Sequence, residues 1–142
     1  MEEEQFQVKL NYEDAMVPTR GSSEAAGYDL YSYEEGRLMP HSTRLFDTGI
    51  SFKVPLGTYG RIAPRSGLSK KGILVNAGVI DRDYRGPVKV MLHNLSNEMY
   101  VVQKNDRIAQ VILEKIKTPE VELVENLGET LRGEGGFGST GV

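Results

Sequence analysis

The chain has 142 residues, a length that suits one domain with a single modest hydrophobic core. It contains no cysteine, which excludes a disulfide framework, a thiolate nucleophile and a cysteine-based zinc site. The formal net charge is only -3, and no apolar run approaches the roughly 20 residues of a membrane-spanning helix, so we expect no membrane partner.

The N-terminus, Met1-Glu2-Glu3-Glu4, is acidic. A secretory signal begins with basic residues before an apolar stretch, and a mitochondrial transit peptide is rich in arginine and poor in acids. We therefore expect an intracellular protein, cytoplasmic or nuclear, that is not secreted.

Alternation of apolar and polar residues is the main pattern along the chain, and it predicts many short strands. The pattern occurs at residues 6–10, 50–54, 88–92 and 120–123, with turn-forming residues between these segments. Residues 107–116 fit a helix or a strand, and the Val-Ile pair within them favours a strand. These features predict a compact all-β domain, either a sandwich or a barrel.

One short helix is expected within residues 66–72 (SGLSKKG). Ser66 can cap the N-terminus of this helix, and Gly72 can end its last turn.

The two histidines, His41 and His93, lie far apart in the sequence and have no partner at a fixed spacing. This argues against a Ser-His catalytic relay, and we expect ordinary surface or strand residues.

Residues 61–89 are basic although the whole chain is acidic. This local charge suggests an anion site, because a protein that coats nucleic acid needs a larger positive field. The alternative is that these side chains solvate exposed strand faces. The segment contains Arg61, Arg65, Lys70, Lys71, Arg82, Arg85 and Lys89 against Asp81 and Asp83.

Residues 64–69 (PRSGLS) could form a phosphate site. A serine and backbone amides at a helix start can cradle an anion, and Arg65 adds a guanidinium fork. A capped surface turn explains this hexamer equally well.

Residues 78–86 (GVIDRDYRG) place Asp81 after apolar Val79 and Ile80 and before Tyr84. We expect a hairpin whose pocket holds a carboxylate and an aromatic ring, in which a partly buried Asp81 orients and deprotonates a water molecule. A solvated acid beside a turn is the alternative.

From Arg132 the sequence reads RGEGGFGSTG, with five glycines in ten residues. Glycine loses the most backbone entropy on ordering, so we expect a domain at residues 1–131 followed by a mobile arm at 132–142. Phe137 is unusual in such an arm, and either docks on a partner surface or has no role.

Five segments together resemble the dUTP pyrophosphatase (dUTPase) family in order and spacing. They are residues 26–32 (AGYDLYS), 64–69, 78–86, 105–110 (NDRIAQ) and the glycine-rich arm. The resemblance covers the chain apart from roughly its first twenty residues. The family usually has glycine where Asn105 stands, and asparagine also tolerates a left-handed backbone.

The resemblance implies a distorted jelly roll (β-clip), and a homotrimer with active sites at subunit interfaces that the arm of a neighbour closes. It also implies Mg²⁺-dependent hydrolysis of dUTP to dUMP and pyrophosphate, which keeps uracil out of DNA and supplies dUMP for thymidylate synthesis. In this reading Asp81 is the catalytic base for water attack on the α-phosphorus.

The resemblance also implies the remaining site residues. Tyr84 packs under the deoxyribose, and main-chain groups around Asn76, Gly78 and Lys89 read uracil. Mg²⁺ is held mainly by the triphosphate, and Asp29 meets it through water. The phosphate contacts are Arg65, Ser66, Gly67 and Gln110, and those of the arm are Arg132, Phe137, Gly138, Ser139 and Thr140, with Phe137 stacked on uracil.

Two alternatives stay open at this point. A dCTP deaminase shares the fold, although the Pro-Arg-Ser-Gly sequence and residues 81–84 favour hydrolysis. A non-catalytic binding module on the same scaffold is the second, because fold alone does not imply activity.

Overall fold

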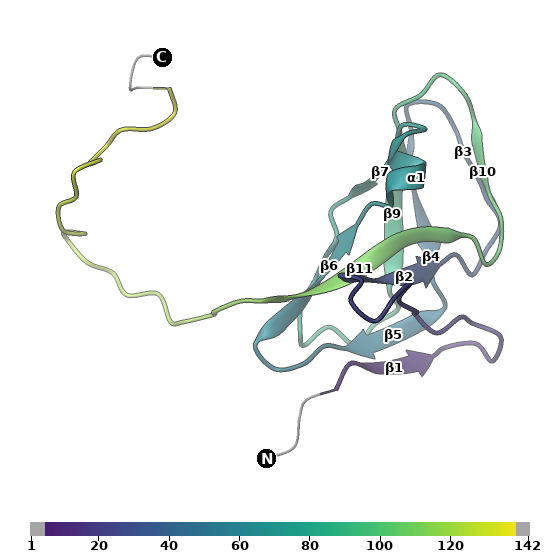
Figure 1. Cartoon of the computed structure of the whole chain (residues 1–142), viewed down its shortest axis with the longest axis horizontal. Coiled ribbons are helices and arrows are strands. Elements are labelled where there is room, and N and C mark those ends of the chain that lie inside the picture. Colours follow the sequence, from purple (N-terminus) through teal and green to yellow (C-terminus); the bar gives the residue numbers. More distant parts are fainter. Residues whose placement is uncertain (1–4, 139–142) are drawn as a thin grey trace.

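The computed structural model describes residues 5–138 of the chain (Figure 1). Nearly all of its regular structure is β-strand, as the alternation predicted, and it contains one short helix. In chain order the elements are β1 (Gln7–Leu10), β2 (Gly27–Tyr31), β3 (Gly36–Leu38), β4 (Thr43–Asp47), β5 (Ile50–Lys53), β6 (Thr58–Ala63), α1 (Ser66–Ser69), β7 (Ile73–Asn76), β8 (Val79–Ile80), β9 (Lys89–Asn94), β10 (Tyr100–Val102) and β11 (Arg107–Lys115). No helix among residues 5–138 is long and apolar enough to cross a membrane.

The strands form four small antiparallel sheets. The largest has the order β2-β11-β6-β8, and the next has the order β4-β9-β7. Two-stranded sheets β1-β5 and β10-β3 complete the domain. Neighbouring strands that are distant in sequence are typical of a jelly roll, so the predicted fold class is confirmed.

The sheets enclose one hydrophobic core. Its side chains come from alternate positions of strands in several sheets, because successive strand residues point to opposite faces. The expected alternation in residues 50–54 and 88–92 is confirmed by the burial of their apolar members. The largest fully buried side chains are Phe46, Leu30, Leu38, Ile50, Ile73, Leu92, Ile108, Val54, Val88, Val90, Val102 and Val111.

The chain changes sheets between β7 and β8. The pairing of β7 with β9 ends at Asn76 opposite Met91, and β8 then pairs with β6 in the other sheet. Gly78 makes this possible with φ of +104°, and a Cβ atom there would lie 2.7 Å from the carbonyl oxygen of Ile62. That same Ile62 donates its amide hydrogen to the Gly78 carbonyl oxygen at 2.7 Å. We call the space between β8 and the start of β9 the fork.

The expected cap of the helix is wrong. The residue that precedes α1 is Arg65, with extended backbone angles, and no side chain caps the helix. Ser66 is instead the first helical residue, because the extended chain from β6 continues through Arg65 before it turns. Gly72 follows the helix with φ of +82°, as expected for the end of such a turn.

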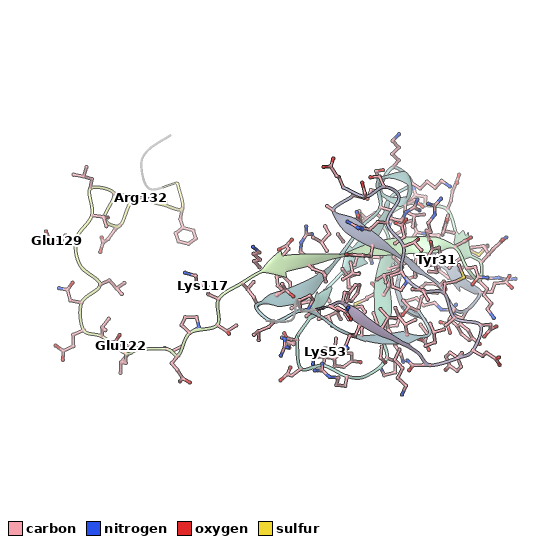
Figure 2. The ribbon with its side chains drawn as sticks, turned by 60° about the horizontal axis from the view of Figure 1, so that its bottom comes forward. Tyr31, Lys53, Lys117, Glu122, Glu129 and Arg132 are labelled. Atoms are coloured by element: carbon pink, nitrogen blue, oxygen red, sulfur yellow. The ribbon has the colours of Figure 1, made fainter. Side chains whose placement is uncertain are left out.

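After β11 the chain leaves the domain. Figures 1 and 2 show residues 116–138 as an extended segment that projects away from the sheets. The strand expected around Val121 and Leu123 is wrong, since both side chains are 96% exposed and lie outside every strand. Their alternation with glutamates has no neighbouring strand to pair with. The boundary between residues 131 and 132 stays a prediction.

Candidate active site

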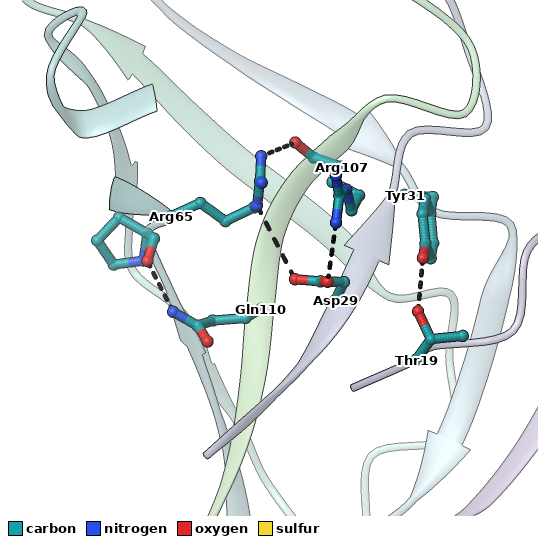
Figure 3. Close-up of polar contacts among 7 residues, drawn as sticks. Thr19, Asp29, Tyr31, Arg65, Arg107 and Gln110 are labelled. Atoms are coloured by element: carbon teal, nitrogen blue, oxygen red, sulfur yellow. Dashed lines mark hydrogen bonds and ion pairs between the residues drawn. The ribbon is translucent and has the colours of Figure 1, made fainter. Parts of the chain in front are cut away.

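Three strands of the four-stranded sheet bring Asp29, Gln110 and the start of residues 64–69 together. Gln110 on β11 lies opposite Asp29 on β2 and, on its other side, opposite Ala63 on β6. Because residues 64–69 begin directly after Ala63, antiparallel register alone places them beside Gln110 (Figure 3).

The side-chain amide of Gln110 joins two of the predicted segments. It donates a hydrogen bond to the Pro64 carbonyl oxygen at 3.0 Å. A Cβ atom at Gly27 would lie 2.1 Å from its Oε1 atom, so the glycine of the first segment leaves the room that Gln110 occupies. This contact packs residues 105–110 closely against residues 26–32.

Asp29 lies between two guanidinium groups. Arg65 Nε is 3.9 Å from Asp29 Oδ1, and Arg107 Nη1 is 3.7 Å from Asp29 Oδ2 (Figure 3). The Asp29 amide donates to the Thr19 carbonyl oxygen at 2.6 Å, which anchors its backbone. The resulting cluster carries one negative and two positive charges. Sequence reasoning missed Arg107, although its charge within the 105–110 segment could have indicated it.

Beside Arg65 lies a pocket of about 460 Å³ whose wall is suited to an anion. Its lining includes three cations and one carboxylate, and the turn at Asn105 has φ of +72°, so asparagine adopts the left-handed backbone as expected. Burial raises the pKa of Tyr100 in this wall, and the nearby Asp106 charge adds to that effect. The lining residues are Arg65, Gly67, Leu68, Lys71, Tyr100, Asn105, Asp106 and Arg107.

A second pocket, of about 230 Å³, lies in the fork and contains both Asp81 and Tyr84. The predicted pocket with a carboxylate and a ring is thus present, but in the single chain Asp81 is exposed and not partly buried. The expected hairpin over residues 78–86 is wrong, because β8 pairs with β6 whereas β9 pairs with β4 and β7. Sequence reasoning missed Leu45, which reaches this pocket from β4. The lining residues are Leu45, Val79, Ile80, Asp81, Tyr84, Pro87 and Lys89.

The main chain of the fork has an open edge. β8 is the edge strand of its sheet and pairs with β6 on one side. At the other side of the fork, Lys89 on β9 pairs with Asp47 on β4. The facing edges of β8 and β9 are therefore not paired with each other, and a planar ligand with its own donors and acceptors could bind there.

The two pockets lie apart within one chain. Continuing the β6–β8 register places Asp81 opposite Tyr59 on β6. Tyr59 lies four residues before Ala63, which is itself opposite Gln110 on β11. Asp81 is therefore two strands away from Gln110. Standard strand spacings then separate Asp81 from Gln110 by roughly 15–20 Å. The structure thus brings together Asp29, Arg65, Ser66, Gly67 and Gln110 as one group, and Asn76, Gly78, Asp81, Tyr84 and Lys89 as another.

The arm forms a third group. Arg132 is exposed, and Figure 2 shows it far from the sheets. Phe137 and Gly138 are exposed as well. Ser139 and Thr140 lie outside the residues that the structure describes.

Neither histidine enters the pockets described above. His41 Nε2 is hydrogen-bonded to Asn97 Oδ1, and His93 Nδ1 to Thr43 Oγ1, each at 2.8 Å. These contacts fit ordinary surface and strand roles.

Within residues 5–138, no group of three or more His, Asp or Glu side chains could hold a metal ion. Asp29 offers carboxylate oxygens, the ligand type that Mg²⁺ prefers, and Mg²⁺ readily keeps several water molecules. An ion beside Asp29 would therefore fit if a substrate supplied most of the remaining oxygens.

Known proteins with similar sequences cover nearly the whole chain. The sequence profile of the dUTPase family matches residues 13–141. The deoxyuridine 5'-triphosphate nucleotidohydrolase of Yarrowia lipolytica is 58% identical over 133 residues, which are 92% of this chain and 85% of the relative. The enzyme of the same name from Arabidopsis thaliana is 56% identical over 138 residues, which are 96% of this chain and 82% of the relative.

Solved structures give the same result. The dUTPase of Staphylococcus bacteriophage 80alpha with dUpNHpp superposes with a TM-score of 0.89 and 32% identity, covering 97% of this chain and 99% of that one. A mutant dUTPase of Staphylococcus aureus phage phi11, described with a structural Mg(II) ion, superposes with a TM-score of 0.82 and 26% identity, covering 88% of this chain and 99% of that one.

Proposed function

The chain belongs to the dUTPase family, a family of hydrolases, and from this premise we propose that it hydrolyses dUTP to dUMP and pyrophosphate with Mg²⁺. The observation that carries the proposal is the pair of pockets, one suited to a phosphate chain and one holding a carboxylate beside a ring. The product would supply thymidylate synthesis, and removal of dUTP would keep uracil out of DNA.

Asp81 is the base in this mechanism. It accepts a proton from a water molecule while the water oxygen forms a bond to the α-phosphorus and the bond from that phosphorus to the pyrophosphate oxygen breaks. Proton abstraction of this kind contributes about 10² to 10⁴ in rate. The position of Asp81 at the end of β8, with Tyr84 in the same pocket, supports this role.

The fork selects the nucleoside. The open main-chain edges near Gly78 and Lys89 can match the fixed donors and acceptors of uracil, and cytosine presents an amino donor where uracil presents an acceptor. The ring of Tyr84 lies under the deoxyribose and leaves no room for a 2′-hydroxyl.

The other group holds the triphosphate, which carries about four negative charges. Arg65, Ser66 and Gly67 contact its inner part, Gln110 lies beside them, and Asp29 contacts the metal through water. When bound, Mg²⁺ neutralises charge on the phosphate oxygens. Arg132, Ser139 and Thr140 of an arm bind the γ-phosphate, and Phe137 stacks on uracil.

A complete site requires more than one copy of the chain. The roughly 15–20 Å that strand spacing puts between Asp81 and Gln110 is too far for one α-phosphate to meet both groups. A homotrimer in which one copy supplies the phosphate pocket, a second the fork and a third the arm satisfies this distance, and the projecting arm supports such an exchange (Figure 2).

A substrate panel tests the activity. We expect pyrophosphate release from dUTP with Mg²⁺, and little from dTTP, dCTP or UTP. Ammonia release from dCTP would instead indicate a deaminase, and no turnover of any nucleotide would indicate a binding module.

A mixing experiment tests the shared site separately. Asp81→Asn and Asp29→Asn chains, each inactive alone, should regain activity when they are unfolded and refolded together, because mixed trimers contain some intact sites. Failure to recover activity in mixed oligomers would place Asp29 and Asp81 in the same chain's site.

A further inference from the structure

A β-bulge on β11 determines where Arg107 points. Gln110 lies opposite Asp29 and Ala109 opposite Leu30, but Arg107 lies opposite Tyr31, so the register shifts by one residue between Arg107 and Ala109. Ile108 and Ala109 are consecutive, yet both are buried, at 1% and 0% exposure. In a regular strand Arg107, three residues before Gln110, would point to the opposite face. The extra residue of the bulge places Arg107 on the same face as Gln110.

Bulges occur often next to functional sites, where they redirect a side chain. Here the redirected side chain is 53% exposed, and its guanidinium lies 3.7 Å from Asp29 Oδ2. The bulge thus adds a second cation to the carboxylate that Arg65 already approaches from its other oxygen.

Arg107 contacts both Asp29 and Arg65. Its side chain faces Asp29, and its backbone carbonyl accepts a hydrogen bond from Arg65 Nη1 at 3.0 Å (Figure 3). Arg65 Nε in turn approaches Asp29, so the three residues form a closed triangle. Replacing the Arg107 side chain removes the ion pair with Asp29 but leaves the backbone carbonyl that Arg65 bonds. A substitution at residue 107 therefore tests the contact with Asp29 separately from the contact with Arg65.

The distances within the triangle leave Asp29 able to bind further groups. At 3.7 and 3.9 Å, both ion pairs are longer than the roughly 2.7–3.2 Å of a hydrogen bond. The guanidinium groups therefore restrict the orientation of the carboxylate by charge, while its oxygens can still accept hydrogen bonds from metal-bound water.

We propose that Arg107 is a positioning residue that acts through Asp29 to hold the metal–triphosphate part of the substrate. The inference rests on the proposed function and deepens it. The simpler alternative is an exposed ion pair, which contributes little to stability and does not affect the metal requirement.

The decisive measurement is calorimetric binding of dUpNHpp over a range of Mg²⁺ concentrations. In Arg107→Gln, the Mg²⁺ concentration for half-maximal binding should rise by roughly 10-fold. Loss of a residue that orients a metal-contacting side chain typically weakens metal binding by about this factor. Arg107→Lys should recover part of this loss, because lysine restores the charge without the planar fork. Binding of dUMP, which lacks the outer phosphates, should not change.

Two comparisons isolate the route through Asp29. In an Asp29→Asn background, Arg107→Gln should raise the Mg²⁺ requirement no further, because residues that act as a unit are not additive. Arg44→Gln is the matched control, since Arg44, like Arg107, is an exposed arginine on a strand. The Arg44 guanidinium donates to the Arg37 carbonyl oxygen, whereas that of Arg107 faces Asp29. Its Mg²⁺ dependence should equal that of the wild type.

An unchanged Mg²⁺ requirement in Arg107→Gln, with wild type binding dUpNHpp and hydrolysing dUTP, would overturn the inference alone. A full additional loss in the Asp29→Asn background would also overturn it. If the wild type neither binds dUpNHpp nor releases pyrophosphate, the proposed function fails and the inference fails with it.

Discussion

The phenolic hydroxyl of Tyr84 donates a hydrogen bond to the Pro87 carbonyl oxygen at 2.7 Å. The Tyr84 amide also donates to the Asp81 carbonyl oxygen at 3.1 Å. The aromatic ring is thus held at its tip and its backbone, and it lines the same pocket as the carboxylate.

This arrangement predicts the basis of sugar selectivity. Tyr84→Ala should raise the ratio of kcat/KM for UTP to that for dUTP by up to about 10²-fold, because the wall against the 2′-hydroxyl is removed. Tyr84→Phe keeps the ring and should change the ratio little. An unchanged ratio in the alanine variant would assign ribose exclusion to another residue.

Loss of the Asp81 charge should separate binding from chemistry. Asp81→Asn should bind dUpNHpp with near wild-type affinity, while single-turnover pyrophosphate release from dUTP falls by about 10² to 10⁴. Asp83→Asn is a matched control, since it removes an exposed carboxylate two residues away. Equal turnover in wild type and Asp81→Asn would remove Asp81 from the role of base.

Docking of the arm can be observed directly because the chain has no tryptophan. Phe137 is fully exposed in the single chain, so the indole of Phe137→Trp should emit as a solvated group before ligand is added. Addition of dUpNHpp and Mg²⁺ should quench or shift this emission as the ring stacks on uracil. A flat response in protein that binds the analogue would contradict closure by this residue.

The contact between Lys104 and Asp14 should appear in the pH dependence of stability. Lys104 Nζ lies 2.6 Å from Asp14 Oδ2, and the Tyr33 hydroxyl donates to Asp14 Oδ1 at 2.7 Å. The hydrogen bond from Lys104, followed by that from Tyr33, lowers the pKa of Asp14 from 3.8 to about 2. The contribution of ionised Asp14 to the free energy of unfolding is therefore complete above pH 3.8 and is lost as the pH falls toward 2.

At the alkaline end the hydrogen bond to Asp14 raises the pKa of Lys104, so its contribution is present below pH 10.5 and is lost as the pH rises through the folded value. In the acid range, Lys104→Met should show a smaller fall in the urea midpoint between pH 4 and 2 than wild type. The variant loses the hydrogen bond that contributes most to the lowered pKa of Asp14, while the Tyr33 contact stays in place. Equal falls would show that this pair does not contribute to acid stability.

The sequence predicts strands well where one face is buried, as in residues 88–92, because burial imposes the alternation that is visible in the chain. Residues 120–123 show the same alternation without a pairing partner, so the local pattern was insufficient there. The bulge that redirects Arg107 and the separation of Asp81 from Gln110 depend on the register between strands distant in sequence. A single sequence does not encode that register in any local pattern.

The change of sheet at Gly78 also links the two larger sheets of the domain mechanically. β8 is hydrogen-bonded to β6, whereas β9 is hydrogen-bonded to β4 and β7. A nucleobase hydrogen-bonded to both edges of the fork would connect the two larger sheets. It should slow amide hydrogen exchange in β4 and β6, even though neither strand needs to contact the base.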